Sequence, residues 1–368
     1  MAETVNTQNI SIELTPWTDK CFSIDWLQLK EELGGNLPVG KASMIFPRNA
    51  DSLKLLLEEN TGKLLFSDNN EGGFNFELPI FITSRGYDKN ALVIDFICTP
   101  DSKFFNERIS GTYSSITDAI QSVYPGSLDI RVESDQNNEQ VIYQNCETSL
   151  NFLRRLGYSY KADTIFGFSW TGLLIKDIIG TSSTGKDENN IDDLPEIIGG
   201  GTGNLTNTIP YSLTYSRKQE YPIINPWTDE DNTLQETYSD YLPKNVISVL
   251  GARYYICRSG YEDMIKNYIL NTTQMETNFE VNYSITGSLM PNSYRLGDLI
   301  KYRRADDDDE IKDADYYTRC LVYSNEVFIG NGQDKVGPHG FNFEWTTELR
   351  GIEKGPWTQI KEEENLSL

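Results

Sequence analysis

Apolar and polar residues alternate with a period of two along much of the chain, and this pattern restricts the fold more than any other feature. The alternation is clearest in five ranges: Cys21–Leu27, Leu78–Ser84, Ala91–Thr99, Phe279–Gly287 and Tyr316–Ile329. Such runs, rich in Ile, Val, Phe and Tyr, are typical of strands with one face buried and the other in water. Their short spacings and turn residues favour barrels or sandwiches over a doubly wound parallel sheet. The sequence therefore predicts a mainly β protein.

Helical patterns are few. We expect helices over Asp51–Asn60, Ser115–Val123, Glu147–Leu156 and Tyr261–Leu270. Asp51 or Ser52 is the expected cap of the first helix. In the second, apolar residues recur three and four positions apart, and Ser115 with Asp118 resembles a capping box. The second and third helices belong to an α+β section in the middle of the chain.

The order of these elements predicts an α+β domain inserted between two similar β-barrels. We expect the first barrel over residues 1–107, the α+β domain over 108–179, an irregular linker and extended segment over 180–242, and the second barrel over 243–368. The linker is expected because residues 180–207 are rich in Gly, Ser, Asn and Asp. A length of 368 residues is compatible with this number of domains.

Charge and composition exclude several classes of protein. A formal net charge of −23 argues against a surface that grips phosphate, although DNA could pass such a surface without binding. Five cysteines without a CxxC motif predict reduced thiols, neither a disulfide framework nor a zinc site. The polar start of the chain predicts no signal peptide. No run has the roughly 18–20 apolar residues of a membrane span, so we expect synthesis in a cytoplasm.

Motifs for catalysis do not occur in the sequence. It contains neither a Walker loop nor a nucleophile elbow, and its single histidine, His339, stands in a loop-like sequence beside glycine. The acidic run Asp306–Asp309, with Glu310, Asp313 and Asp315, lacks the glycine and spacing of an EF-hand loop. A solvated hairpin loop is the expectation there, and a hard-cation site is the alternative. We expect no catalytic residue, no cofactor, no metal site and no enzyme activity.

The stretch VIYQNCETSLNFLRRLGYSY, residues 141–160, is the best-defined packing unit of the sequence. On a helix, positions three and four apart share a face. The shared face here consists of Ser149, Phe152, Leu153 and Leu156. Gly157 follows directly and is expected to end the helix in the left-handed conformation. The stretch is therefore predicted to have a structural role.

Polar residues of the same stretch flank the predicted helix. Gln144 and Glu147 stand before and at the start of its first turn, where free amides and the helix dipole favour an acceptor. Arg155 points away from the apolar face. Two partners are open for it: an acid of its own chain, which would steady the helix, or an acid of a neighbouring chain, which would help to close an assembly.

With its neighbours, this stretch resembles a module found in phage baseplate hub proteins, late-control tail proteins and VgrG-type spike proteins. The shared pattern is a hydrophobic-x-Gln turn, an acidic residue, a Phe-Leu-x-Arg-Leu helix and a strand pair. The matching residues are Ile142, Gln144, Glu147, Phe152, Leu153, Arg155, Leu156 and Gly157. A weaker similarity lies in SYRLGDLIKY, residues 293–302, where Gly297 and Asp298 precede a hydrophobic strand.

The resemblance implies a function. Hub proteins of this family form homotrimers in which each chain gives two tube-like barrels, so that three chains make a pseudo-sixfold ring. The implied protein is a structural hub of a phage tail tip or baseplate, located in the virion, through which genomic DNA passes without specific binding. Its implied partners are the tail tube protein, a trimeric spike protein and baseplate wedge or sheath-associated proteins. Alternatives are a hub of a contractile injection or type VI secretion apparatus, a virion-associated cell-wall hydrolase, and a host glycan-binding protein.

Overall fold

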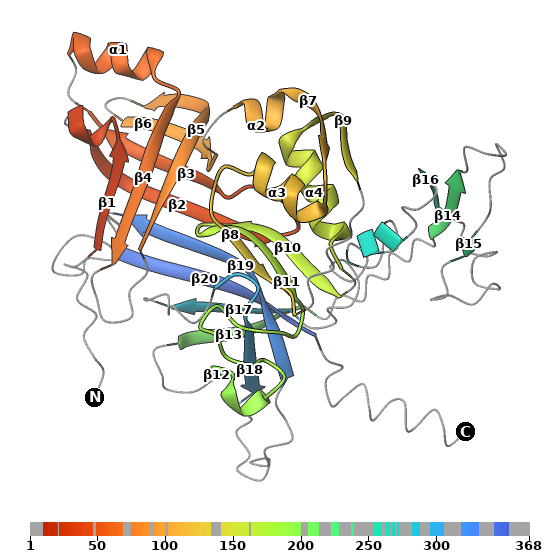
Figure 1. Ribbon diagram of the computed structural model, residues 1–368. Coiled ribbons are helices and arrows are strands. Elements are labelled where there is room, and N and C mark those ends of the chain that lie inside the picture. The colour runs from red at the N-terminus through yellow and green to blue at the C-terminus, as the bar shows by residue number, and fades with distance from the viewer. Residues whose placement is uncertain are drawn as a thin grey trace.

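Figure 1 shows the computed structural model of the chain. It describes residues 10–20, 22–46, 49–68, 75–88, 91–99, 102–133, 141–161, 163–199, 205–212, 222–227, 237–238, 253–258, 263–264, 267–268, 271, 282–287, 295–304, 318–330 and 342–352. His339 and the acidic run from Asp306 to Asp315 lie outside the described residues. The predictions for that loop and that run therefore stay predictions.

Strands dominate the described part of the chain. The helices are α1 (Ala50–Glu58), α2 (Lys103–Asn106), α3 (Ile116–Val123) and α4 (Ser149–Ser159), with 3₁₀-helices η2 (Thr18–Lys20) and η3 (Ile191–Asp193). The strands of the first half are β1 (Ile10–Thr15), β2 (Ser23–Leu33), β3 (Val39–Ile45), β4 (Thr61–Asp68), β5 (Asn75–Asp88), β6 (Ala91–Ile97), β7 (Arg108–Tyr113), β8 (Leu128–Arg131), β9 (Ile142–Thr148), β10 (Thr164–Ser169) and β11 (Gly172–Asp177). Those of the second half are β12 (Glu196–Gly199), β13 (Leu205–Ser212), β14 (Pro222–Trp227), β15 (Thr237–Tyr238), β16 (Arg253–Arg258), β17 (Asn282–Gly287), β18 (Leu299–Arg304), β19 (Thr318–Gly330) and β20 (Asn342–Gly351). The predicted mainly β fold with a small α+β insert is confirmed.

One large sheet contains strands from both the N-terminal and the C-terminal part of the chain. Its strands follow the order β1-β4-β5-β6-β3-β2-β19-β20-β17-β13, with β8, β10 and β11 on one branch and β12 and β18 on another. In Figure 1 the red and orange N-terminal strands continue into the blue C-terminal strands, and α2, α3 and α4 gather beside them. The described residues also form a β15-β14-β16 sheet and a β7-β9 ribbon. The N-terminal β unit (β1–β6) and the C-terminal β unit (β17–β20) thus share one sheet.

Strand β2 is where the parts of the chain meet. It pairs antiparallel with β19, from Glu32 opposite Ser324 to Trp26 opposite Gly330. Its other edge pairs with β3 as far as Lys30. Beyond that point the hairpin strand β10 pairs with β2 at its C-terminal end. Every second side chain of β2 from position 27 to 33 is buried, which fits the predicted period of two.

Two hydrophobic cores lie against this sheet. The first is built mainly from β1–β6, and the second from α2, α3, α4, β10 and β11. Strand β19 contributes to both cores, because Cys320 and Val322 face the first while Leu321 faces the second. Alternating side chains of one strand point to opposite faces, so β19 is buried on both sides here. The insert and the N-terminal β unit are therefore held together through a C-terminal strand.

The first two predicted helices form close to their expected positions. The hydroxyl of Ser115 accepts a hydrogen bond from the amide of Asp118 at 3.1 Å, which caps α3 as its sequence indicates. The cap of α1 differs from the prediction: the side chain of Asn49, and neither Asp51 nor Ser52, accepts the bond, from the amide of Ser52 at 2.8 Å. Asn49 has the extended backbone that a capping residue needs, one position before the helix.

Part of the expected linker is folded. Residues 180–190 form a loop closed by a β-bridge between Thr181 and Asp187, and β12 then pairs parallel with β18. Within the predicted fourth helix, the described positions 263, 264, 267 and 268 are helical, and Met264 belongs to the core of the insert. No helix in the described ranges has the length and apolar character needed to cross a membrane.

Candidate functional site

Helix α4 carries the apolar face that the motif predicts. Phe152, Leu153 and Leu156 are completely buried, and Ser149 lies beside them. The helix begins later than expected, because Thr148 is the cap: its hydroxyl accepts a hydrogen bond from the amide of Asn151 at 3.3 Å. The four residues of this face place α4 against the hairpin β10–β11.

Gln144 and Glu147 lie in β9 and leave the capping of α4 to Thr148. Gln144 is buried, donates to the carbonyl of Glu147 at 3.2 Å and accepts from the hydroxyl of Tyr113 at 3.1 Å. Both bonds hold the strand in place where the chain turns into the helix. The two residues therefore act on the strand that leads into the helix, which differs from their predicted role at its first turn.

Arg155 binds within its own chain. Its guanidinium lies 2.6 Å from the carboxylate of Glu147 and donates to the carbonyl of Tyr143 at 2.9 Å. It also lies over the ring of Phe152, 5.2 Å from the centroid. Of the two partners left open by the sequence, the acid of the same chain is the one that the structure shows.

Gly157 lies inside α4, and the prediction that it ends the helix is wrong. The helix continues to Ser159, and Gly157 has no left-handed backbone. A Cβ atom at this position would stand 2.1 Å from Cδ2 of Phe166, whose ring is fully buried. The glycine is needed for close approach of the helix to β10, a reason that cannot be seen in the local sequence.

The side chain of Asn271 binds backbone carbonyls at the end of α4. Its buried side-chain amide donates to the carbonyls of Tyr158 and Lys161, at 2.8 and 2.6 Å, and its oxygen accepts from the amide of Thr164 at 3.2 Å. Carbonyls in the last turn of a helix have no partner within the helix. A residue about 110 positions along the chain thus satisfies the Tyr158 carbonyl of the last turn and the Lys161 carbonyl just after the helix. Sequence reasoning missed Asn271, and no local signal marks it.

The Gly-Asp pair before β18 lies at the contact between the insert and the C-terminal β unit. Gly297 has a positive φ of +82°, which favours glycine. Asp298 is only 2% exposed and accepts from Arg131 at 2.7 Å and from the amide of Ser183 at 2.9 Å. It therefore ties β8 of the insert and the 180–190 loop to the start of β18.

Beside Asp298 lies an ion pair between Lys176 and Glu188, both without any exposed side-chain surface. Glu188 also accepts from the amides of Leu299 and Gly180, at 2.9 and 3.2 Å. Burial lowers the pKa of the Lys176 ammonium, and the Glu188 carboxylate partly offsets this effect. Lys176 and Asp177 interrupt an otherwise apolar run, residues 172–179, which was a signal for a buried lysine, whereas nothing in the acidic linker distinguished Glu188.

A further buried charge, Glu31 on β2, joins three parts of the chain. Its carboxylate accepts from the amide of Trp170 in the β10–β11 turn at 2.7 Å and from the side chain of Asn325 on β19 at 2.9 Å. Asn325 in turn accepts from the hydroxyl of Thr347 on β20 at 2.7 Å. Burial raises the pKa of Glu31 to about 7, against the lowering effect of these donors and of Arg295.

We call the contact formed by Glu31, Arg131, Lys176, Glu188 and Asp298 the seam. Its charges bind one part of the chain to another. In the part of the chain that the structure describes, no group of three or more His, Cys, Asp or Glu could hold a metal ion. The motif residues of β9 and α4 pack the insert internally, and the Gly-Asp pair before β18 attaches the insert to the C-terminal β unit.

Comparisons with known proteins agree with this fold. No family model and no curated protein sequence matches the chain. Among solved structures, it is similar to the prophage MuSo2 43 kDa tail protein from Shewanella oneidensis, with a TM-score of 0.53 and 12% identity over 93% of this chain and 96% of that one. It is also similar to the tail protein from Neisseria meningitidis MC58, with a TM-score of 0.57 and 10% identity over 95% and 98% of the two chains. The chain thus has a fold of tail proteins over nearly its whole length.

The contact between Gly157 and Phe166 predicts the effect of Gly157→Ala. Alanine is about 1 kcal/mol better than glycine inside an exposed helix. Here we expect a loss of about 1–3 kcal/mol in the free energy of unfolding, because the new methyl group overpacks a buried ring. Urea denaturation of both proteins measures this difference in the free energy of unfolding. The control Asn151→Ala, at an exposed position of the same helix, should change stability little; a Gly157→Ala variant more stable than wild type would contradict this assignment.

The buried ion pair predicts a non-additive pattern. Lys176→Met leaves the Glu188 carboxylate buried without its cation and should cost about 3–5 kcal/mol of unfolding free energy. The double variant Lys176→Met/Glu188→Gln lacks both charges of the pair and should be more stable than Lys176→Met alone. Chemical denaturation of the set tests this. The exposed pair of Lys54 and Glu58 provides the control, since Lys54→Met should cost less than about 0.5 kcal/mol.

The raised pKa of Glu31 predicts a pH dependence. Between the ordinary value of 4.5 and about 7, the folded protein binds more protons at Glu31 than the unfolded chain does. This residue's contribution to stability should therefore fall as pH rises through that window, by up to about 3 kcal/mol. Unfolding free energies of wild type and Glu31→Gln at pH 5, 6, 7 and 8 measure it.

Glu31→Gln should gain stability relative to wild type as pH increases. The charged or titratable groups that face Glu31 are Arg295, Cys98, Asp129 and Arg131. They are present in both proteins, so the difference between the two curves isolates Glu31. Glu13→Gln, at an exposed position of β1, is the matched control for the loss of a carboxylate. A flat difference for Glu31→Gln would show that Glu31 does not titrate in this range.

Proposed function

We propose that this chain is a structural hub of a phage tail tip or baseplate. In this proposal three copies form a ring that joins the tail tube protein to a trimeric spike protein and contacts baseplate wedge or sheath-associated proteins. The observation that carries the proposal is the likeness of fold to two tail proteins across nearly the full length of all three chains. A likeness confined to one β unit would have been compatible with many other roles.

The arrangement of the sheet supports a ring. Each chain contains an N-terminal and a C-terminal β unit, and β2 and β19 join them edge to edge. Three such chains would place six β units around an axis, which suits a sixfold tube on one side and a threefold spike on the other. Open edges in such an assembly are covered by the next copy, and this removes the aggregation hazard of a free strand edge.

The charge of the chain supports passage of DNA. The formal net charge is −23, and a negative wall repels phosphate, so a nucleic acid would move through the ring without binding. On the open face of the sheet, lysines are paired with acids: Lys30 with Glu32 at 2.9 Å and Lys41 with Asp95 at 3.5 Å. Paired lysines leave little free positive charge to hold a DNA backbone.

Native mass spectrometry and negative-stain electron microscopy of the purified chain test the proposal. We expect a trimer at micromolar concentration and rings with a central opening, and no retention of double-stranded DNA at physiological salt. A protein that stays monomeric at high concentration and forms no rings would refute the hub. Peptidoglycan zymography separates the proposal from a cell-wall hydrolase, because a clear band would favour the enzyme.

Arg155 offers a matched variant for the same experiment. Its guanidinium is bound to Glu147 and Tyr143 of its own chain. Arg155→Ala should therefore leave the number of chains in the assembly unchanged. The expected cost is local, on the order of 1 kcal/mol of stability at the start of α4. Loss of the trimer in this variant, with the fold intact, would instead assign Arg155 to the contact between copies.

A further inference from the structure

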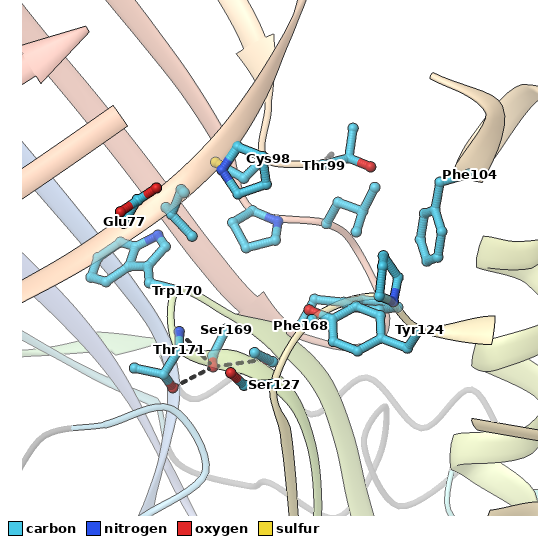
Figure 2. Close-up of a pocket in the computed structure, with 17 residues that line it drawn as sticks. Glu77, Cys98, Thr99, Phe104, Tyr124, Ser127, Phe168, Ser169, Trp170 and Thr171 are labelled. Carbon is cyan, nitrogen blue, oxygen red and sulfur yellow. Dashed lines mark hydrogen bonds between the residues drawn. The ribbon is translucent and has the colours of Figure 1, made fainter. Parts of the chain in front are cut away.

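A pocket lies where the N-terminal β unit meets the insert (Figure 2). None of the five seam residues lines it. Its volume is about 260 Å³. The N-terminal β unit supplies part of β5 and the residues directly after β6, including Cys98, and the insert supplies Phe104, Tyr124 and the β10–β11 turn. Pockets between two packed units are common places for small-molecule sites.

Aromatic rings form opposite walls of the pocket. On one side Phe104, Tyr124 and Phe168 pack against one another, with centroid separations of 6.2, 6.3 and 5.9 Å. On the other side stands Trp170, which stacks on Phe76 at 5.4 Å. The three rings of the first wall support one another, and Phe168 and Trp170 also contact rings outside the lining, Phe166 and Phe76. The walls are therefore held in place, and the pocket is preformed.

The pocket offers no free charge to an occupant. The carboxylate at its edge, Glu77, is paired with Lys63 at 2.6 Å. Burial raises the pKa of the Cys98 thiol and raises that of the Tyr124 phenol to about 12, so both groups are neutral at physiological pH. The hydroxyl of Ser169 is bonded to Thr171 and to the carbonyl of Gly172, both at 2.9 Å. A charged molecule would lose its hydration here without gaining a partner.

We propose that this pocket binds a small, uncharged, ring-containing molecule, of the size of phenol or indole, between the aromatic trio and Trp170. The volume sets the size, since an apolar cavity of about 150 Å³ accepts benzene and drug-sized ligands need roughly 300 Å³ or more. The walls offer no free charge to pair with an ion, so the occupant is expected to be uncharged. An occupant would touch the N-terminal β unit and the insert at once, so that binding stabilises their junction. The proposal does not depend on the hub function.

Binding of four probes to the full chain tests this site. Phenol and indole should bind saturably, with dissociation constants on the order of 0.1–10 mM, and should raise the melting temperature by about 1–3 °C near saturation. Benzoate and benzylammonium have the same ring with a charge and should do neither. Absence of saturable binding by the neutral probes, or equal binding by the charged ones, would overturn the proposal.

Two readouts locate the bound probe. Ser127, an exposed residue at the edge of the pocket, can be enlarged: Ser127→Trp should abolish phenol binding, while Ser122→Trp, at an exposed position of α3 outside the pocket, should not. Phenol at about nine times its dissociation constant should slow labelling of Cys98 by a methanethiosulfonate about tenfold. The exposed thiol of Cys146, outside the pocket, should react at an unchanged rate. Equal phenol binding by both tryptophan variants would place the probe elsewhere and refute the site.

Discussion

The pairing of β2 with β19 is the constraint on which the rest of the fold depends. It joins positions about 300 apart in the sequence, from Glu32 with Ser324 to Trp26 with Gly330. Because β19 is buried on both faces at positions 320–322, the same strand closes the core of the N-terminal unit and that of the insert. Such long-range pairing carries a large loop-closure cost, which the two shared cores offset. The two β units are therefore parts of one sheet and cannot be exchanged or removed independently.

Buried charges then fix the insert against this sheet. Asp298 with Arg131, Glu188 with Lys176, and Glu31 with Asn325 each connect segments more than ten residues apart, and each has further backbone or hydroxyl donors. Apolar packing alone tolerates sliding, whereas a buried charge is costly in any arrangement that separates it from its partner. These charges therefore fix the position of the insert relative to the sheet more than they add to the net free energy of unfolding. The carboxylates of the seam lie on β2, in the 180–190 loop and directly before β18. The insert is therefore bound to both the N-terminal and the C-terminal β unit.

Local patterns predicted the local structure, and long-range contacts account for what they missed. The apolar spacing and the Ser115 cap of α3 depend on neighbours within four positions, and both appear in the structure. Gly157 looked like a helix end because a glycine after an apolar face commonly is one. Its real reason is the ring of Phe166, and the true end of α4 depends on Asn271. Glu188 stood among many acids of a polar linker, and only the fold brings it to Lys176.

The continuous sheet also limits how the molecule can move. A hinge between the two β units would have to break the hydrogen bonds between β2 and β19, and a hinge at the insert would have to separate the buried charges of the seam. Either motion exposes apolar surface from a core that both parts share. Mobile parts of proteins are drawn from weakly held segments. Here strand hydrogen bonds, shared cores and buried charges join the segments that meet, so we expect the two β units and the insert to move together.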